Sequence, residues 1–170
     1  MKKKRILTIC AAGLIALLCV WRLWPRTLND ILDIDEDLFS TITVQVSEFG
    51  VSNGSPYIDI YRLDIPSAED DNYAPVMSII QNTKFQSDFR NLLPWDVVSV
   101  GSGADKITHS ANVMLTWGDS NETCYISFHG DRVVSFDISG KTEFLVYHPT
   151  KRKTLNELAV FIKENGVLQK

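Results

Sequence analysis

Apolar and polar residues alternate along two stretches in the first half of the chain. Ile42, Val44 and Val46 alternate with polar side chains, which is the period-two pattern of a strand with one buried face. A segment rich in Gly, Ser and Asn, residues 50–56, separates this stretch from a second strand-like run at residues 57–63. The pattern predicts a β-hairpin with a long connecting loop.

From residue 111 onward the alternation sharpens into four short apolar runs. Glycines lie between these runs, at Gly118, Gly130 and Gly140, where each supplies the positive φ that a hairpin turn needs. The runs predict a four-stranded antiparallel meander whose single apolar face needs a cover. Their bounds are residues 112–117, 123–128, 132–138 and 142–147.

Helical spacing of apolar residues appears twice in this part of the chain. Residues 73–82 form one predicted helix, and the pattern leaves open whether that helix continues toward Pro94. The second begins with a capping box formed by Thr154 and Glu157, and Gly166 stands where a C-cap belongs. We therefore predict an α+β domain in which an antiparallel sheet, a hairpin plus a four-stranded meander, is covered by two helices.

The N-terminus has the layout of a membrane anchor. A basic start, residues 2–5, precedes sixteen uncharged residues, 6–21, and no small residues mark a cleavage site after them. These features predict an uncleaved signal anchor with a single-pass transmembrane helix and the N-terminus inside, which places the protein at the cell membrane with the bulk of the chain extracytoplasmic. The alternative is a buried helix of a soluble protein.

Three segments follow from these patterns. Residues 1–26 are the predicted anchor, residues 27–40 an acidic juxtamembrane tether or short helix, and residues 41–170 the extracytoplasmic α+β domain. In the tether, Asp33, Asp35 and Asp37 have the spacing of a calcium loop, but the glycine and the distal glutamate of such a loop are missing. A solvated acidic tether is favoured over a cation site.

The charge is distributed unevenly. The chain of 170 residues has a net charge of −4, yet residues 1–26 carry six basic residues and no acidic one, so residues 27–170 carry −10. Residues 30–71 hold eleven acidic residues and one basic residue, Arg62. An acidic domain lacks the basic face of a phosphate-binding protein, so we do not expect nucleic acid as a partner.

Candidate chemistry is sparse. His109, His129 and His148 are far apart in sequence, and the last two are predicted to be surface residues in a turn and at a strand end. Cys124 shares a face with Ile126 in an alternating run, which predicts a buried thiol rather than a nucleophile. No nucleophile elbow, phosphate loop or metal-ligand motif is present, so no catalytic, cofactor-binding or metal-ligating residue and no cofactor is predicted.

The chain combines a basic start and an uncleaved span with a C-terminal part of the form Phe-His-Gly-Asp-Arg-Val-Val-Ser-Phe-Asp-Ile followed by Leu-Asn-Glu-Leu-Ala-Val-Phe-Ile-Lys-Glu-Asn-Gly. This combination resembles small uncharacterised extracytoplasmic proteins of Gram-positive bacteria. Such proteins typically have one membrane anchor, one small α+β domain and no assigned activity. The resemblance implies a compartment and a class, and it transfers no functional residue.

Three functions are compatible with this sequence. The first is a non-catalytic domain at the cell envelope that binds an envelope protein or a small ligand through its sheet face or its acidic N-terminal half. The second is a small envelope hydrolase, whose residues would come from Asp96, Asp105, His109 and Ser110. The third is an immunity or inhibitor protein whose acidic face blocks a basic target.

Overall fold

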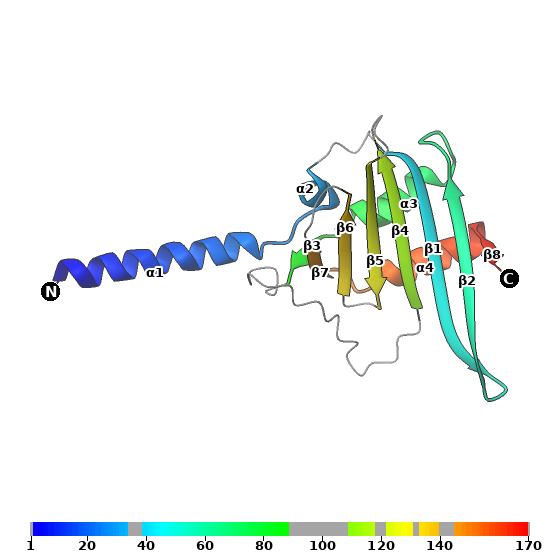
Figure 1. Cartoon of the computed structure of the whole chain (residues 1–170), viewed down its shortest axis with the longest axis horizontal. Helices are drawn as coiled ribbons and strands as arrows, with labels where there is room; N and C mark the ends of the chain where they lie inside the picture. The colour runs from blue at the N-terminus through cyan, green and yellow to red at the C-terminus, as the bar shows by residue number, and fades with distance from the viewer. Residues whose placement is uncertain are drawn as a thin grey trace.

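The chain folds into one antiparallel sheet with helices packed against one face (Figure 1). A computed structural model describes residues 2–33, 39–88, 109–117, 122–130, 133–139 and 145–169. The helices are α1 (Lys2–Arg22), α2 (Leu28–Leu32), α3 (Tyr73–Gln81) and α4 (Thr154–Asn165). The strands are β1 (Phe39–Ser52), β2 (Ser55–Ile65), β3 (Phe85–Ser87), β4 (His109–Trp117), β5 (Glu122–His129), β6 (Val133–Ile138), β7 (Leu145–Pro149) and β8 (Val167–Gln169).

Within these residues the sheet has eight strands in the order β3-β7-β6-β5-β4-β1-β2-β8. Every pair of neighbouring strands is antiparallel. Strand β1 pairs with β2 along one edge and with β4 along the other, so the predicted hairpin and the predicted meander form one continuous sheet.

The core lies between the sheet and helices α3 and α4. Val44 pairs with Val113, which pairs with Ile126, which pairs with Phe136, and all four side chains are fully buried. Helix α4 adds its buried apolar stripe to this core, including Leu158. The other face of the sheet, here called the outer face, carries the alternate residues of each strand.

Helix α2 belongs to the same core. Leu28, Ile31 and Leu32 are buried in it, so the first part of the acidic segment is a packed helix rather than a solvated tether. Thr27 and Asp30 form a capping box, because each side chain accepts a hydrogen bond from the backbone N–H of the other. The backbone bond from Thr27 lowers the pKa of Asp30.

A buried hydroxyl pair joins α3 to α4. Thr83 Oγ1, just after α3, lies 2.7 Å from Thr154 Oγ1, and Thr154 Oγ1 donates to the Lys151 carbonyl at 3.1 Å. The hydroxyl of Thr154 is therefore used inside the core. The predicted capping box with Glu157 is wrong, since α4 begins after Lys153 without a side-chain cap.

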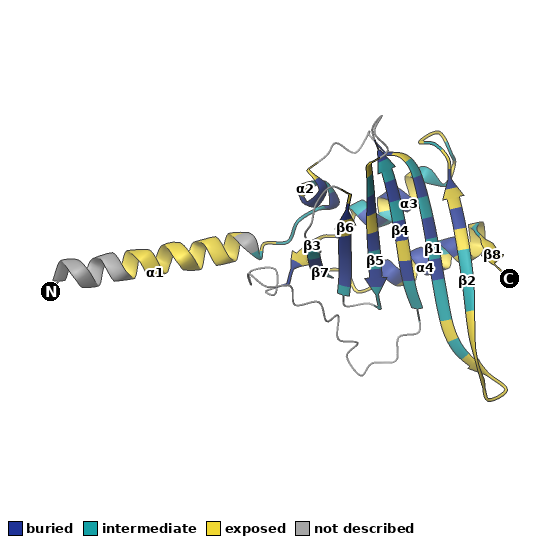
Figure 2. Ribbon diagram, in the orientation of Figure 1, coloured by how far each residue is buried: buried dark blue, intermediate teal, exposed yellow. Residues whose placement is uncertain are grey.

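Helix α1 extends away from the sheet, and the side chains described along it are largely exposed (Figure 2). The chain between α1 and α2 touches the sheet edge, where Arg26 and Phe85 exchange two backbone hydrogen bonds of 2.9 and 2.7 Å. Trp21 lies against the Arg26 guanidinium, 5.6 Å from the ring centroid.

The membrane predictions are not supported. Among the residues that the structure describes, no helix combines the length and the apolar character needed to cross a membrane. The sixteen uncharged residues between Arg5 and Arg22 are fewer than the roughly 20 that a span usually requires. This finding contradicts the predicted signal anchor, the predicted transmembrane helix and the predicted single-pass localisation at the cell membrane.

The α+β fold prediction is also corrected. The strand and helix positions were largely right, but over the described ranges the architecture is a single eight-stranded antiparallel sheet with four helices, and none of those helices is long and apolar enough to cross a membrane. The sequence prediction missed β3 and β8, because three residues are too few to show an alternating pattern. Helix α3 ends at Gln81 and does not continue directly into residues 82–88.

We predict that Gly166→Ala destabilises the domain. Gly166 is the C-cap of α4, as expected, but its φ of −93° is not left-handed. An added Cβ would lie 2.6 Å from the Ile162 carbonyl oxygen and 2.9 Å from the Arg62 carbonyl oxygen, which are both backbone atoms. We expect a loss of about 1–3 kcal/mol in the free energy of unfolding, measured by urea denaturation.

Gly13→Ala is the matched control for this measurement. A Cβ at Gly13 meets nothing within 4 Å, so the same added methyl group should leave the unfolding of the sheet domain unchanged. Equal stability of the Gly166→Ala variant and the wild type would show that the close approach of α4 to β2 is not as described.

Candidate functional site

The hairpin of β1 and β2 projects beyond the rest of the sheet (Figure 1). Strand β4 pairs with β1 only as far as Glu48, opposite His109, whereas β1 and β2 stay paired to Ser52 and Ser55. We call the projecting part, residues 49–58, the arm. Over these residues the two strands are paired with each other and with no other described strand.

The arm ends in a tight turn rather than the long loop predicted for residues 50–56. Asn53 and Gly54 have φ values of 52° and 80°, and Ser52 pairs directly with Ser55 across them. Two central residues with positive φ make a type I′ turn, for which Asn-Gly is the preferred sequence. The Asn53-Gly54 dipeptide is the sequence signal for this turn, and the Gly- and Ser-rich composition around it led to the prediction of a longer loop.

The residues of the arm are largely exposed (Figure 2), and one of its two faces is apolar. Phe49 pairs with Ile58 and Val51 pairs with Pro56, so these four side chains share one face, which continues the outer face of the sheet. The exposed fractions of Phe49, Val51 and Ile58 are 37%, 72% and 60%. The arm thus holds a cluster of apolar side chains that the chain's own core does not cover.

The opposite face of the arm is fixed at its root by charge. Glu48 Oε2 accepts a hydrogen bond of 2.6 Å from Lys163 Nζ on α4, and Glu48 Oε1 lies 3.7 Å from His109 Nε2 on β4. The Lys163 hydrogen bond lowers the pKa of Glu48, and the same bond raises the pKa of Lys163. Lys163 Nζ also lies 5.6 Å from the centroid of the Tyr61 ring on β2, so α4 contacts both strands at the base of the arm and β4 contacts β1.

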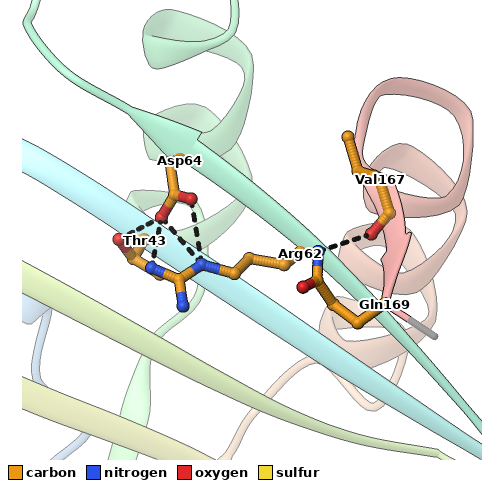
Figure 3. Close-up of polar contacts among 5 residues, drawn as sticks. All are labelled: Thr43, Arg62, Asp64, Val167 and Gln169. Carbon is orange, nitrogen blue, oxygen red and sulfur yellow. Dashed lines mark hydrogen bonds and ion pairs between the residues drawn. The ribbon is translucent and has the colours of Figure 1, made fainter.

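A second polar cluster ties β1 to β2 on the outer face (Figure 3). Arg62 Nε lies 2.9 Å and 3.0 Å from the two carboxylate oxygens of Asp64, and Thr43 Oγ1 donates to Asp64 Oδ1 at 2.7 Å. The Arg62 hydrogen bond lowers the pKa of Asp64. The single basic residue of the acidic stretch 30–71 is thereby paired within the chain.

Two histidines lie on the outer face near the other edge of the sheet. His129 Nε2 is 3.2 Å from Ser135 Oγ, and His148 Nε2 is 2.8 Å from the Asp88 carboxylate. Ser135 and Asp88 are only 2% and 4% exposed. Both histidines are partly exposed, and the side chain of His148 is 45% exposed, but each contacts a buried polar partner that the sequence did not predict.

Among the residues that the structure describes, these histidines do not form a recognisable catalytic arrangement. A serine nucleophile needs an accessible hydroxyl with a base beside it, and the base needs an orienting group. Ser135 is buried, and the carboxylate of Asp88 contacts His148. Over the residues that the structure describes, the two pairs are separate polar contacts.

The residues proposed for a hydrolase do not converge where the structure describes them. His109 and Ser110 are consecutive in β4, so their side chains point to opposite faces of the sheet. His109 faces Glu48, and Ser110 lies on the outer face opposite Ser47. Asp96 and Asp105 lie outside the described residues.

No group of three or more His, Cys, Asp or Glu side chains in the described part of the chain is placed to hold a metal ion. Of the calcium-like triplet, Asp33 ends α2 with a left-handed φ of 58°, and Asp35 and Asp37 lie outside the described residues. Cys124 is fully buried, as predicted.

Comparison with known proteins identifies no relative, because no protein-family model, no curated protein and no solved structure matches the chain. The resemblance to small Gram-positive extracytoplasmic proteins therefore stays a prediction.

We predict that His129 makes the protein less stable in acid. Burial lowers the pKa of His129 below its ordinary value of about 6.5, so the folded chain binds a proton here less readily than the unfolded chain. The contribution of neutral His129 to the free energy of unfolding is complete above about pH 6.5, and it is lost as the pH falls through the lower pKa of His129 in the folded state. Urea denaturation at a series of pH values between 8 and 5 measures it.

The variant His129→Gln keeps a polar group beside Ser135 but cannot titrate. The difference in unfolding free energy between wild type and variant should be constant from pH 8 to 7 and should shrink at lower pH. A difference that stays constant down to pH 5 would contradict the buried, neutral histidine.

Proposed function

We propose that the chain is a non-catalytic protein-binding domain and that the arm is its binding element. The observation that carries this proposal is the apolar cluster of Phe49, Val51 and Ile58 on one face of a projecting hairpin. Scattered exposed apolar residues are common on protein surfaces, but a contiguous group marks an interaction site. Covering such side chains is favourable by roughly 25 cal/mol per Å² of apolar surface removed from water.

The arm is suited to this role because its conformation is already fixed in the unbound chain. Its strands are paired along their whole length, its turn has the favoured sequence, and Glu48 is held from both α4 and β4. A preorganised hairpin loses little conformational entropy on binding. The apolar side chains can then act as anchors in a complementary pocket or groove.

The charge pattern favours an apolar contact over an acidic one. Although residues 30–71 contain eleven acidic residues, residues 49–58 contain no charged residue at all. Binding through the arm should therefore depend little on salt, whereas the immunity or inhibitor alternative uses an acidic face and requires strong salt dependence. The dependence of binding on ionic strength therefore distinguishes the apolar arm contact from the acidic-face alternative.

We predict that a photo-crosslinking amino acid at Val51 yields a discrete protein adduct in cells that make the full chain. The adduct should persist in lysates adjusted from about 0.1 to 1 M salt, because an uncharged contact is not screened. The additional change Ile58→Asp should abolish it by placing a charge in the apolar cluster. The 60% exposure of Ile58 implies that this change leaves folding intact, which the thermal unfolding midpoint verifies.

The same crosslinking residue at Val160 is the matched control. Val160 is 50% exposed on α4 and lies outside the arm. The absence of an adduct from Val51, or the same adducts from Val51 and Val160, would overturn the proposal. An adduct lost at high salt would favour the acidic-face alternative.

A further inference from the structure

The chain contains the dipeptide Asn-Gly twice, in two different settings. Asn53-Gly54 forms the turn of the arm, and Asn165-Gly166 ends helix α4. Asparagine is a thermolabile residue, and a following glycine leaves the backbone nitrogen beside the asparagine carboxamide unshielded because glycine has no side chain. Since the two dipeptides are identical, a difference in their reactivity has to come from the fold.

The reaction open to both dipeptides is deamidation. The glycine backbone nitrogen gives its proton to a base in the solvent and attacks the side-chain Cγ of the asparagine, whose amide nitrogen leaves as ammonia. The resulting cyclic imide takes up one water molecule at either of its carbonyl carbons. The ring then opens to an aspartate with the normal backbone or to an isoaspartate whose backbone runs through the side chain. In total one water is consumed, one ammonia is released and the new carboxyl group loses its proton, with no oxidation or reduction.

The arm leaves Asn53 open to this attack. Asn53 and Gly54 are exposed at the tip of the projecting hairpin (Figure 1), and a Cβ built on Gly54 would meet nothing within 4 Å. Over the described ranges, no group forms a hydrogen bond with the Asn53 carboxamide or the Gly54 N–H. Both reacting groups therefore face solvent rather than a partner in the fold.

Only the tip of the arm has to open for the reaction. The Asn53 carboxamide must rotate toward the Gly54 nitrogen, which changes the backbone angles of the turn. Residues 49–58 pair with no other described strand, so this movement disturbs the Ser52–Ser55 pair and leaves the rest of the described sheet paired. Local opening at the end of an element costs far less free energy than global unfolding. The folded chain can therefore react at Asn53.

The fold closes both reacting groups of the second dipeptide. Asn165 Nδ2 donates a hydrogen bond of 2.9 Å to the Phe161 carbonyl, and the Gly166 N–H donates one of 2.8 Å to the Ile162 carbonyl. Gly166 also lies against the backbone of Arg62, whose carbonyl oxygen would be 2.9 Å from an added Cβ, and the next residues are held in β8 against β2. The reaction at Asn165 requires the last turn of α4 and the start of β8 to separate from the sheet.

We infer that Asn53 is a site of spontaneous deamidation in the folded chain and that the fold protects Asn165. The inference concerns the free chain and does not depend on a partner of the arm. Deamidation places a carboxylate within residues 49–58, which carry no charge. An isoaspartate also lengthens the backbone between Ser52 and Ser55, so the turn loses the Asn-Gly geometry that it needs.

The rates at the two dipeptides test the inference directly. The full chain is incubated in mildly alkaline buffer with a thiol reductant, and peptide mapping by mass spectrometry follows the conversion of each amide into a carboxylate. In the folded chain we expect Asn53 to react at least about tenfold faster than Asn165, because the arm opens locally and the end of α4 does not. In concentrated urea the two rates should become similar, since only the fold distinguishes the dipeptides.

The variant Asn53→Gln is the matched control. Its carboxamide is one methylene longer and reaches the Gly54 nitrogen less readily, so the fast release of ammonia should disappear while the rate at Asn165 stays unchanged. Similar rates at Asn53 and Asn165 in the folded chain would overturn the inference. So would an Asn53 that reacts only after urea is added.

An added binding measurement keeps this inference separate from the proposed function. Chains with the photo-crosslinking residue at Val51, with and without Asn53→Gln, are aged in alkaline buffer and then added to lysate. If the arm binds as proposed, ageing should reduce the adduct of the chain with Asn53 and spare that of the variant. An equal adduct from both after deamidation of Asn53 would leave the modification site standing and contradict a role of the arm tip in binding. A Val51 adduct without any deamidation at Asn53 would overturn only the modification site.

Discussion

Strand β1 pairs with a neighbouring strand along both of its edges, and its inward side chains are buried in the core. The rest of the molecule depends on this double constraint. Ile42, Val44 and Val46 have no exposed surface, and each faces a residue of β4 and a residue of β2. A slip of one residue would turn all three to the outer face, so the register is strongly specified. The same pairing joins the hairpin to the meander and makes one sheet of them.

The arm exists because the apolar pattern of β1 changes phase. Up to Val46 the apolar residues have even numbers and face the core, whereas Phe49 and Val51 have odd numbers and face outward. The pairing of β1 with β2 has no irregularity that could restore the phase. The core therefore cannot account for these apolar residues. The burial of the β1 side chains ends at Glu48, where a partly exposed carboxylate is held by Lys163.

Much of the fold could be predicted where a pattern is long enough to have a period. The strands around Val44, Val113 and Ile126 and the helix containing Leu158 alternate or repeat over several turns, and the structure has them where the pattern placed them. The short elements could not be found this way, since α2 has five residues and β3 and β8 have three each. Their formation depends on tertiary contacts such as the pairing of Phe85 with Pro149.

Local signals were also misassigned between sites that look alike. Thr27 with Asp30 and Thr154 with Glu157 have the same spacing, yet only Thr27 caps a helix, because the hydroxyl of Thr154 meets Thr83 in the core. Of the candidate site, the Asn53-Gly54 dipeptide predicts the turn of the arm, but nothing in the sequence shows that β4 begins only at His109. The free length of the arm is thus a property of the sheet rather than of the hairpin.

The two projections of the molecule leave the sheet from opposite sides. The chain following α1 is fastened to the edge strand β3 by the paired backbone of Arg26 and Phe85, while the arm belongs to β1 and β2 near the other edge. Six strand intervals of about 4.8 Å separate β3 from β2, which amounts to roughly 29 Å. Hydrogen-bonded strands resist stretching in this direction. The width of the sheet therefore sets a minimum distance between a molecule that lies beside α1 and a partner that binds the arm.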